Sequence, residues 1–144
     1  MFSKACEYAI KAAIYIAGQS NRQHTVNVKE VSLSIDAPMA FTAKILQLLC
    51  RKGVLKSVRG KQGGFFFEES RQKLLNIYDL VKIVDGDGIF TKCGLGLHRC
   101  SSENPCPVHN DFKIVRDQLI VTTQAHSFYD LALKTEKGEV WLKN

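Results

Sequence analysis

The sequence has 144 residues, of which 45% are hydrophobic, enough apolar material to bury a core within one domain. No run of about 18 consecutive apolar residues is present, so the sequence predicts no membrane span. A formal net charge of +6 favours anionic partners. Glu7, Tyr8 and Lys11 interrupt the apolar N-terminus, which we interpret as an ordinary helix rather than a signal peptide. We therefore expect a cytoplasmic protein whose five cysteines are reduced thiols or ligands.

The first half of the chain has the pattern of three helices. Apolar residues at helical spacing predict a first helix over residues 3–18, with Ser3 as its cap and Gly18 as its end. A second, short helix is expected over 27–34, and after a turn a third helix over 38–52. The residues expected to form the buried stripe of this third helix are Phe41, Ile45, Leu48 and Leu49.

Two short strands, 54–58 and 64–68, are predicted next, and the tip between them, RGKQGG, is rich in glycine and cations. A hairpin directly after a helix-turn-helix is a wing. Further along, Asn76 is expected to cap a helix over 77–84, and a longer helix is expected over 110–123. Apolar residues expected on one side of this longer helix are Phe112, Val115 and Leu119. Residues Ser127 and Asp130 open a final short segment, SFYDLAL.

These elements predict a fold that is mainly α with a small β wing, a winged helix-turn-helix followed by a long helix. In such a fold the second helix of the helix-turn-helix enters the major groove of double-stranded DNA. The chain supports this reading because no acidic residue interrupts the basic segment from Lys44 to Gln62. The small outward residues of the helix allow close approach to base edges, and Arg59 at the wing tip suits a minor groove. The residues expected to contact DNA are Met39, Ala40, Thr42, Ala43, Lys44, Gln47, Arg51, Lys56, Arg59, Gly60, Lys61 and Gly63.

Three cysteines gather in one turn-rich loop. Cys93, Cys100 and Cys106 have the spacing Cys-x6-Cys-x5-Cys, and His109 follows the last cysteine by three residues. Soft thiolate ligands select zinc, copper(I) or an iron–sulfur cluster. We favour a cluster; the alternatives are a zinc site of the three cysteines with His109, and redox thiols that pair on oxidation. The sequence contains no Cys-x-x-Cys motif and no glycine-rich nucleotide loop after a strand, so we expect no enzyme, and a small electron carrier is the remote alternative.

The segments EYAIKAAIYIA, IDAPMAFTAKILQLLCRKG, SVRGKQGGF and IYDLVKIVDG, together with the cysteine loop, resemble the iron–sulfur-sensing winged-helix repressors of bacteria, the IscR/NsrR/CymR type. The resemblance covers most of residues 1–133, although the first cysteine interval is six residues where relatives commonly have five. It implies a homodimeric transcription regulator, most simply a repressor, on a pseudo-palindromic operator, with the helix after the cysteine loop at the dimer interface.

The resemblance also bears on the ligand set, and the predicted elements suggest a division of the chain. A [2Fe–2S] or [4Fe–4S] cluster would bind the three cysteines, and its fourth ligand would be His109 or Glu7 of the partner subunit, with His98 a weaker candidate. Residues 1–86 would form the DNA-binding region, 87–109 the cysteine sensor loop, and 110–144 the dimerisation helix and C-terminal segment. We expect the loop to lie between the dimer helix and the DNA-binding half, so that its ordering shifts the recognition helices.

Overall fold

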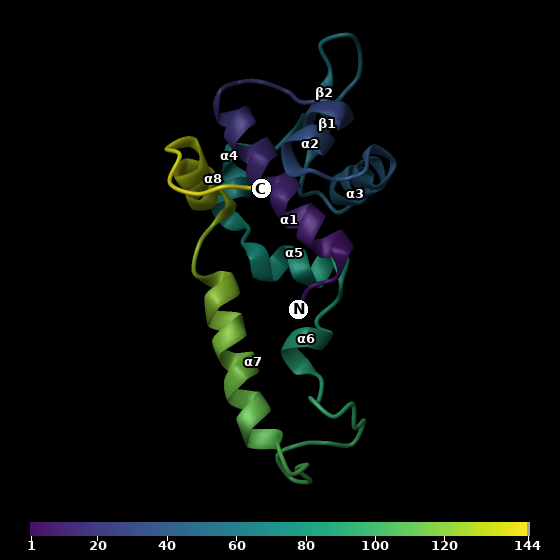
Figure 1. Ribbon diagram of the computed structural model, residues 1–144, viewed down its shortest axis with the longest axis vertical. Coiled ribbons are helices and arrows are strands. Elements are labelled where there is room, and N and C mark those ends of the chain that lie inside the picture. Colours follow the sequence, from purple (N-terminus) through teal and green to yellow (C-terminus); the bar gives the residue numbers. More distant parts are fainter. Residues whose placement is uncertain (144) are drawn as a thin grey trace.

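The structure is a computed structural model that describes residues 1–143. Figure 1 shows an elongated molecule in which a group of helices carries the hairpin and one long helix stands away from that group. In chain order the elements are α1 (Lys4–Asn21), α2 (Val28–Ile35), α3 (Met39–Arg51), β1 (Lys56–Val58), β2 (Gly64–Phe66), α4 (Glu69–Leu74), α5 (Ile77–Val84), α6 (Gly88–Thr91), α7 (His109–Gln124) and α8 (Phe128–Glu136). The predicted fold class, mainly helical with a two-stranded wing, is confirmed. Residue 144, the last of the predicted C-terminal segment, lies outside the described residues.

Helix α1 is the centre of the core because its small side chains let α2, α3, α5 and α8 pack against it. Its fully buried residues include Ala9, Ala12, Ala13, Ile16 and Ala17. Ser3 caps the helix, as predicted. The prediction that Gly18 ends it is wrong: the helix continues to Asn21, and the missing side chain of Gly18 leaves room for Glu136 of α8. Packing against α8 thus outweighs the cost of about 1 kcal/mol for glycine inside a helix.

Helices α2 and α3 form the helix-turn-helix. Asn27 caps α2 by accepting a hydrogen bond from Glu30 N at 2.9 Å, and Asp36 ends it in the left-handed conformation with φ of 53°. The axes of the two helices differ in direction by 111°, as in helix-turn-helix motifs. No single helix within residues 1–143 is long and apolar enough to cross a membrane, and this bent pair meets those criteria only when its two helices are taken together.

The buried face of α3 differs from the predicted stripe. Its buried residues are Thr42, Ile45, Leu46 and Leu49. Phe41 is exposed and Leu48 is half-buried, so these two positions of the prediction are wrong. Thr42, expected to face outward, is fully buried, and its hydroxyl donates to Pro38 O at 2.9 Å. Because this bond satisfies the hydroxyl, the threonine can turn toward the core without an unpaired polar group.

The wing strands are shorter than the predicted segments 54–58 and 64–68. The flanking residues that turn into the core instead are Val54, Leu55 and Phe67. Val26, in the connection between α1 and α2, pairs with Phe65 on the other side of β2. A Cβ atom on Gly64 would lie 2.5 Å from Val26 O, so only glycine permits this approach. The base of the wing is thereby attached to the helical body.

The second half of the chain begins and ends with capped helices. Asn76 caps α5, as the sequence predicts, and Ser127 caps α8; in the structure each of the two also forms a capping box with the residue three positions on. Helix α8 packs against α1 and α4, with Phe128 and Ala132 fully buried, so the chain returns to the DNA-binding half after α7. The short helices α4 and α6 were not predicted, because six and four residues show too little periodicity.

Candidate metal centre and nucleic-acid interface

The outward side of α3 presents most of the residues predicted to meet DNA. Met39, Ala40, Lys44, Gln47 and Arg51 are exposed, and Ala43 is half-buried. Thr42 is the exception, since its side chain is buried and its hydroxyl is bonded within the helix. At the start of α3 no side chain caps the backbone N–H groups, since Pro38 occupies the cap position. These N–H groups are therefore available to an acceptor such as a phosphate oxygen.

The wing carries the other predicted residues. Arg59, Gly60 and Lys61 are exposed at its tip, and Gly63 is half-buried. Lys56, at the base, is exposed, but its Nζ lies 2.8 Å from Glu68 Oε1. The basic segment is free of acids in sequence, yet the hairpin brings a carboxylate beside its first lysine. Sequence reasoning missed Glu68 because the pairing depends on strand register, which places Lys56 opposite Phe66.

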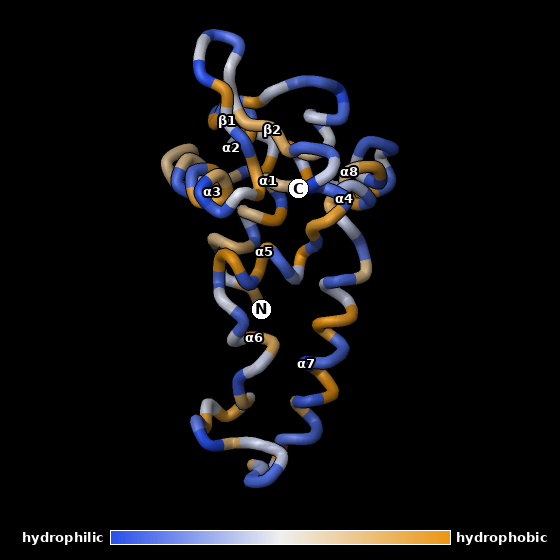
Figure 2. The backbone as a smooth tube through the Cα atoms, turned by 180° about the vertical axis from the view of Figure 1, so that it is seen from behind, coloured by the Kyte–Doolittle hydropathy of each residue, from blue (hydrophilic) through white to orange (hydrophobic). Residues whose placement is uncertain are grey.

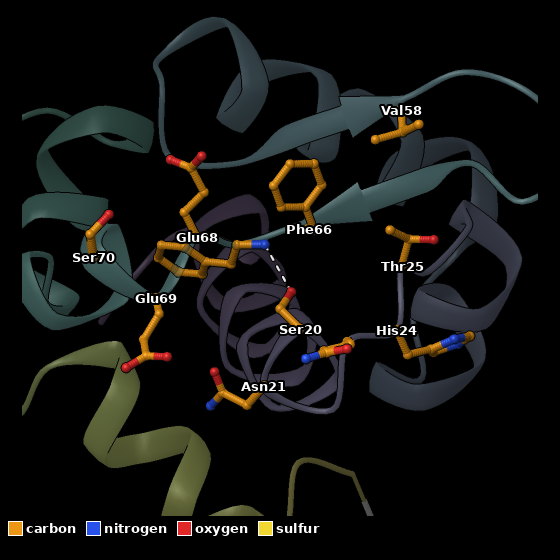
Figure 3. Close-up of a pocket in the computed structure, with 11 residues that line it drawn as sticks. Ser20, Asn21, His24, Thr25, Val58, Phe66, Glu68, Glu69 and Ser70 are labelled. Carbon is orange, nitrogen blue, oxygen red and sulfur yellow. Dashed lines mark hydrogen bonds between the residues drawn. The ribbon is translucent and has the colours of Figure 1, made fainter.

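A hollow beside the base of the wing marks where the basic surface ends. Figure 3 shows it between the end of α1, strand β2 and the start of α4, with Glu68 and Glu69 among its lining side chains. Ser20 Oγ accepts a hydrogen bond from Phe67 N at 2.9 Å and so ties α1 to the end of the wing. Carboxylates repel phosphate, so this hollow is unfavourable for a phosphate backbone, unlike the exposed cations of the wing tip and α3.

The cysteine loop brings its three sulfur atoms together. The Sγ atoms of Cys93, Cys100 and Cys106 all lie within 4.8 Å of one another. Cys93 Sγ and Cys106 Sγ are 3.7 Å apart, and Cys106 N donates to Cys100 Sγ at 3.4 Å. His109, the first residue of α7, places Nδ1 3.1 Å from Cys100 Sγ. The predicted ligands Cys93, Cys100, Cys106 and His109 therefore converge at one end of the molecule.

The thiol of Cys93 differs electrostatically from those of Cys106, Cys6 and Cys50. Backbone N–H groups of Leu97 and Leu95 lower the pKa of Cys93 to about 7, whereas desolvation raises the pKa of Cys106. Burial raises the pKa of Cys6 to about 12, and it also raises the pKa of Cys50. A thiolate is the nucleophile and metal ligand, so Cys93 is prepared for this chemistry while Cys6 behaves as a core residue.

The donor set fits a thiolate-bound metal. Two thiolates on one tetrahedral metal, each at about 2.3 Å, have sulfur atoms about 3.8 Å apart. The 3.7 Å between Cys93 Sγ and Cys106 Sγ matches this separation. The arrangement suits a zinc ion or one iron of a cluster, with Cys100 and His109 beside it.

Glu7 does not join the three sulfur atoms within one chain. It lies in the first turn of α1, where its carboxylate pairs with Lys4 Nζ at 2.9 Å. Hydrogen bonding to Lys4 lowers the pKa of Glu7 and raises that of Lys4. As a ligand, Glu7 would have to come from the partner subunit, and its carboxylate would have to leave the ion pair with Lys4 in order to bind the metal.

The cysteine loop does not lie between α7 and the DNA-binding half, contrary to our expectation. Figure 1 places it at the end of α7 remote from the wing, with α6 descending opposite α7. A helix of 16 residues is about 24 Å long, and Figure 1 shows the loop beyond the end of α7 that is farther from α3. The sequence predicts this helix but not its direction relative to the core.

Comparison with known proteins decides the family. The model of the Rrf2 family, described as an iron-dependent transcriptional regulator, matches residues 2–134. The chain belongs to the Rrf2 family. An Aquifex aeolicus protein named among the HTH-type transcriptional regulators is 32% identical over 121 residues, covering 83% of this chain and 82% of that protein. The family is one of DNA-binding transcriptional regulators, which confirms the predicted resemblance and the prediction that the chain is not an enzyme.

Solved structures share the fold of this Rrf2 protein. CymR, the global cysteine regulator of B. subtilis, superimposes with a TM-score of 0.75 at 16% identity, covering 92% of this chain and 95% of CymR. IscR of T. potens gives a TM-score of 0.73 at 18% identity, covering 97% of this chain and 91% of IscR. The three clustered cysteines give this chain a site that could bind a metal or a cluster.

Proposed function

We propose that this Rrf2 regulator is a homodimeric repressor whose affinity for a pseudo-palindromic operator is set by an iron–sulfur cluster on Cys93, Cys100 and Cys106. The observation that carries the proposal is the convergence of these three sulfur atoms within 4.8 Å, in a chain of an iron-dependent regulator family. A cluster would supply a centre that iron supply, oxygen or nitric oxide can alter, and the chain's own residues would hold it and read its presence.

DNA recognition would use the exposed side of α3 and the tip of the wing. The residues proposed to contact DNA are Met39, Ala40, Ala43, Lys44, Gln47, Arg51, Arg59, Gly60, Lys61 and Gly63, with Lys56 in a weaker role. The first turns of α3 carry no arginine, so phosphate contacts would supply much of the affinity, which would fall steeply with salt.

A second copy would pack on α7. Ile114, Val115 and Val121 are 69%, 60% and 61% exposed on this helix, which stands apart from the body. Figure 2 shows hydrophobic and hydrophilic residues alternating along α7. Exposed apolar side chains on a long helix favour burial against a partner, and a pseudo-palindromic operator requires a twofold partner.

The geometry favours His109 as the fourth ligand, because its Nδ1 already lies 3.1 Å from Cys100 Sγ. Glu7 of the partner subunit is the alternative. For cluster type, the 3.7 Å separation of Cys93 and Cys106 supports one iron shared by two cysteines, as in a [2Fe–2S] cluster. In a [4Fe–4S] cluster each cysteine binds its own iron.

A zinc-dependent regulator is the second candidate, because the same 3.7 Å separation also fits two thiolates on one zinc ion. His109 would complete a Cys3His site. Zinc is colourless and would not require sulfide, so composition separates the two candidates.

The test is anaerobic purification followed by absorption spectroscopy, iron, sulfide and zinc analysis, and operator binding at several salt concentrations. We expect charge-transfer absorption between roughly 300 and 500 nm with iron and sulfide bound. Cys93→Ser should lose both and change operator affinity, while the matched control Cys50→Ser, a half-buried thiol outside the loop, should retain both. Stoichiometric zinc without sulfide would replace the first candidate by the second. Colourless, metal-poor protein whose Cys93→Ser variant binds DNA equally well would refute both.

A further inference from the structure

One side of α7 faces α6 and the cysteine loop. At about 100° per residue, positions 109, 112, 116, 119 and 123 share that side. Thr123 is buried, and Leu119 packs against the small cluster around Phe90 of α6. The exposed Ile114 and Val121 lie on the opposite side. Helix α7 therefore has an inner face toward the cysteine loop in addition to the outer face proposed for the second copy.

Two residues of this inner face hold the backbone on either side of Cys93. Arg116 Nη1 donates to Lys92 O at 3.2 Å, one residue before Cys93. Phe112 covers Gly94, one residue after it: a Cβ atom at Gly94 would lie 2.7 Å from Phe112 Cγ. The ring thus occupies the space that any larger side chain at position 94 would need.

Cys93 depends on these contacts in a way that the other two ligands do not. Cys106 lies three residues before the start of α7. The first backbone N–H of that helix, His109 N, donates to Cys106 O at 3.1 Å and so holds Cys106 directly against the helix. Cys100 is bound to the same end through Cys106 N and His109 Nδ1. Cys93 instead follows α6, so its sulfur reaches the others only when the end of α6 is held against α7.

We propose that Arg116 and Phe112 are positioning residues that hold Cys93 in register with Cys100 and Cys106, and that Gly94 is required because the Phe112 ring fills the Cβ position. This inference rests on the proposed function in one respect: it takes the three thiols to be the ligands of a metal centre. It adds that ligand Cys93 and helix α7 are fixed to each other through the inner face of the helix.

Cobalt(II) is the probe, because it reports thiolate ligation by charge-transfer absorption without cluster assembly. The metal-free, reduced full chain is titrated anaerobically. Loss of a group that orients a ligand typically weakens metal affinity by about 10–100-fold. We expect Arg116→Ala to weaken cobalt binding about tenfold and Arg116→Lys to restore part of it. Lys113→Ala, an exposed position of the same helix paired with Asp117, is the matched control and should bind as wild type.

The contact between Gly94 and Phe112 gives a second test that general destabilisation cannot mimic. Gly94→Ala should weaken cobalt binding because its methyl group meets the ring. Adding Phe112→Ala removes the obstacle, so the double variant should bind at least as tightly as Gly94→Ala alone, and the two losses should not add. Additive losses, or wild-type binding by both Gly94→Ala and Arg116→Ala, would overturn the inference.

Hydrogen exchange of the metal-free protein supplies a readout that is independent of metal. Gly96 N donates to Cys93 O at 2.9 Å, and its exchange should accelerate in Arg116→Ala and remain unchanged in Lys113→Ala. Equal exchange in all three proteins would count against the positioning role. Wild-type protein that binds cobalt as described but never carries a cluster or zinc and controls no operator would refute the proposed function while leaving this inference standing. Wild-type protein without thiolate-to-cobalt absorption would refute both.

Discussion

The ring of Tyr8 in α1 meets the ring of Phe41 in α3 edge-on, with their centroids 5.7 Å apart. Lys11 Nζ lies 5.1 Å from the Tyr8 ring centroid and also donates to Ile35 O at 3.0 Å, at the end of α2. One turn of α1 therefore touches both helices of the helix-turn-helix. This turn directly follows Glu7, so an event at the start of α1 is one residue away from the contacts that orient α3.

Replacing Tyr8 by Leu should loosen this connection. Edge-to-face aromatic pairs contribute about 0.5–1.5 kcal/mol beyond their buried area, so we expect the free energy of unfolding to fall by about 1 kcal/mol. Because the ring orients α3 rather than touching DNA, operator affinity should fall by more than the unfolded fraction explains. Chemical denaturation together with operator titration checks this. Tyr129→Leu, whose ring packs near Lys73 of α4, is the control and should lower stability without that extra loss of affinity.

The wing should show unequal roles for its cations. Arg59 is exposed at the tip, whereas Lys56 is already paired with Glu68. We expect Arg59→Ala to weaken operator binding and to reduce the slope of log affinity against log salt by about 1. Lys56→Ala should change that slope less, and Glu68→Gln should strengthen binding by releasing Lys56. Fluorescence anisotropy at four or more salt concentrations measures the slopes. A larger effect for Lys56→Ala than for Arg59→Ala would contradict the assignment.

Thr42 should matter for stability and not for base recognition. Its hydroxyl is buried and donates to Pro38 O, which also accepts from Thr42 N at 2.9 Å. Thr42→Val keeps the shape and removes one hydrogen bond, so the free energy of unfolding should fall by about 0.5–1 kcal/mol. Operator affinity and sequence preference should stay as in wild type once the folded fraction is accounted for. Loss of discrimination at one base pair would show that the hydroxyl reaches DNA after all.

The sequence predicted elements well where local signals decide them. Asn76 caps α5 and Ser127 begins α8 where the sequence indicates a cap and a new segment, and the glycine-rich tip lies between two antiparallel strands. It failed where distant packing decides. Gly18 stays inside α1 because α8 packs there, and α3 turns Thr42 inward because the threonine satisfies its own hydroxyl.

The candidate site divides in the same way. Cysteine spacing was sufficient to predict that Cys93, Cys100 and Cys106 converge. Their position at the far end of α7 depends on how a mostly exposed helix leaves the core, for which the sequence holds no strong signal. Arg116 was overlooked, although its spacing of four residues from Phe112 and seven from His109 places the three on one helix side.

Cysteine reactivity should rise through neutral pH at one position. The pKa of Cys93 is lowered from the ordinary 9.0 to about 7 by backbone N–H groups, which stabilise the thiolate in the folded state. The sign follows from linkage: this stabilisation is complete above the unfolded pKa of 9.0 and is lost as pH falls through about 7. In reduced, metal-free protein, Cys93 should therefore alkylate first, with a rate that rises between about pH 6 and 8. Cys6 should stay unreactive because burial raises its pKa to about 12. Peptide mapping after iodoacetamide treatment at several pH values measures the alkylation of Cys93 and of Cys6. Preferential labelling of Cys106 would contradict the expectation that Cys93 reacts first.

The fourth ligand should be identifiable by paired substitutions. His109 Nδ1 lies 3.1 Å from Cys100 Sγ, whereas Glu7 is held by Lys4 at 2.9 Å and stands apart from the three sulfur atoms. We expect His109→Ala to shift the absorption of the loaded protein and to speed loss of its metal to a chelator. Glu7→Gln should leave both unchanged, and Lys4→Ala, which frees the Glu7 carboxylate, should also have no effect. If the ligand instead comes from Glu7 of the partner subunit, the pattern reverses. Glu7→Gln then speeds metal loss, and Lys4→Ala slows it because the Glu7 carboxylate no longer has Lys4 as a partner that competes with the metal. The opposite responses to Lys4→Ala separate the two ligand sets even if both single ligand variants lose some metal.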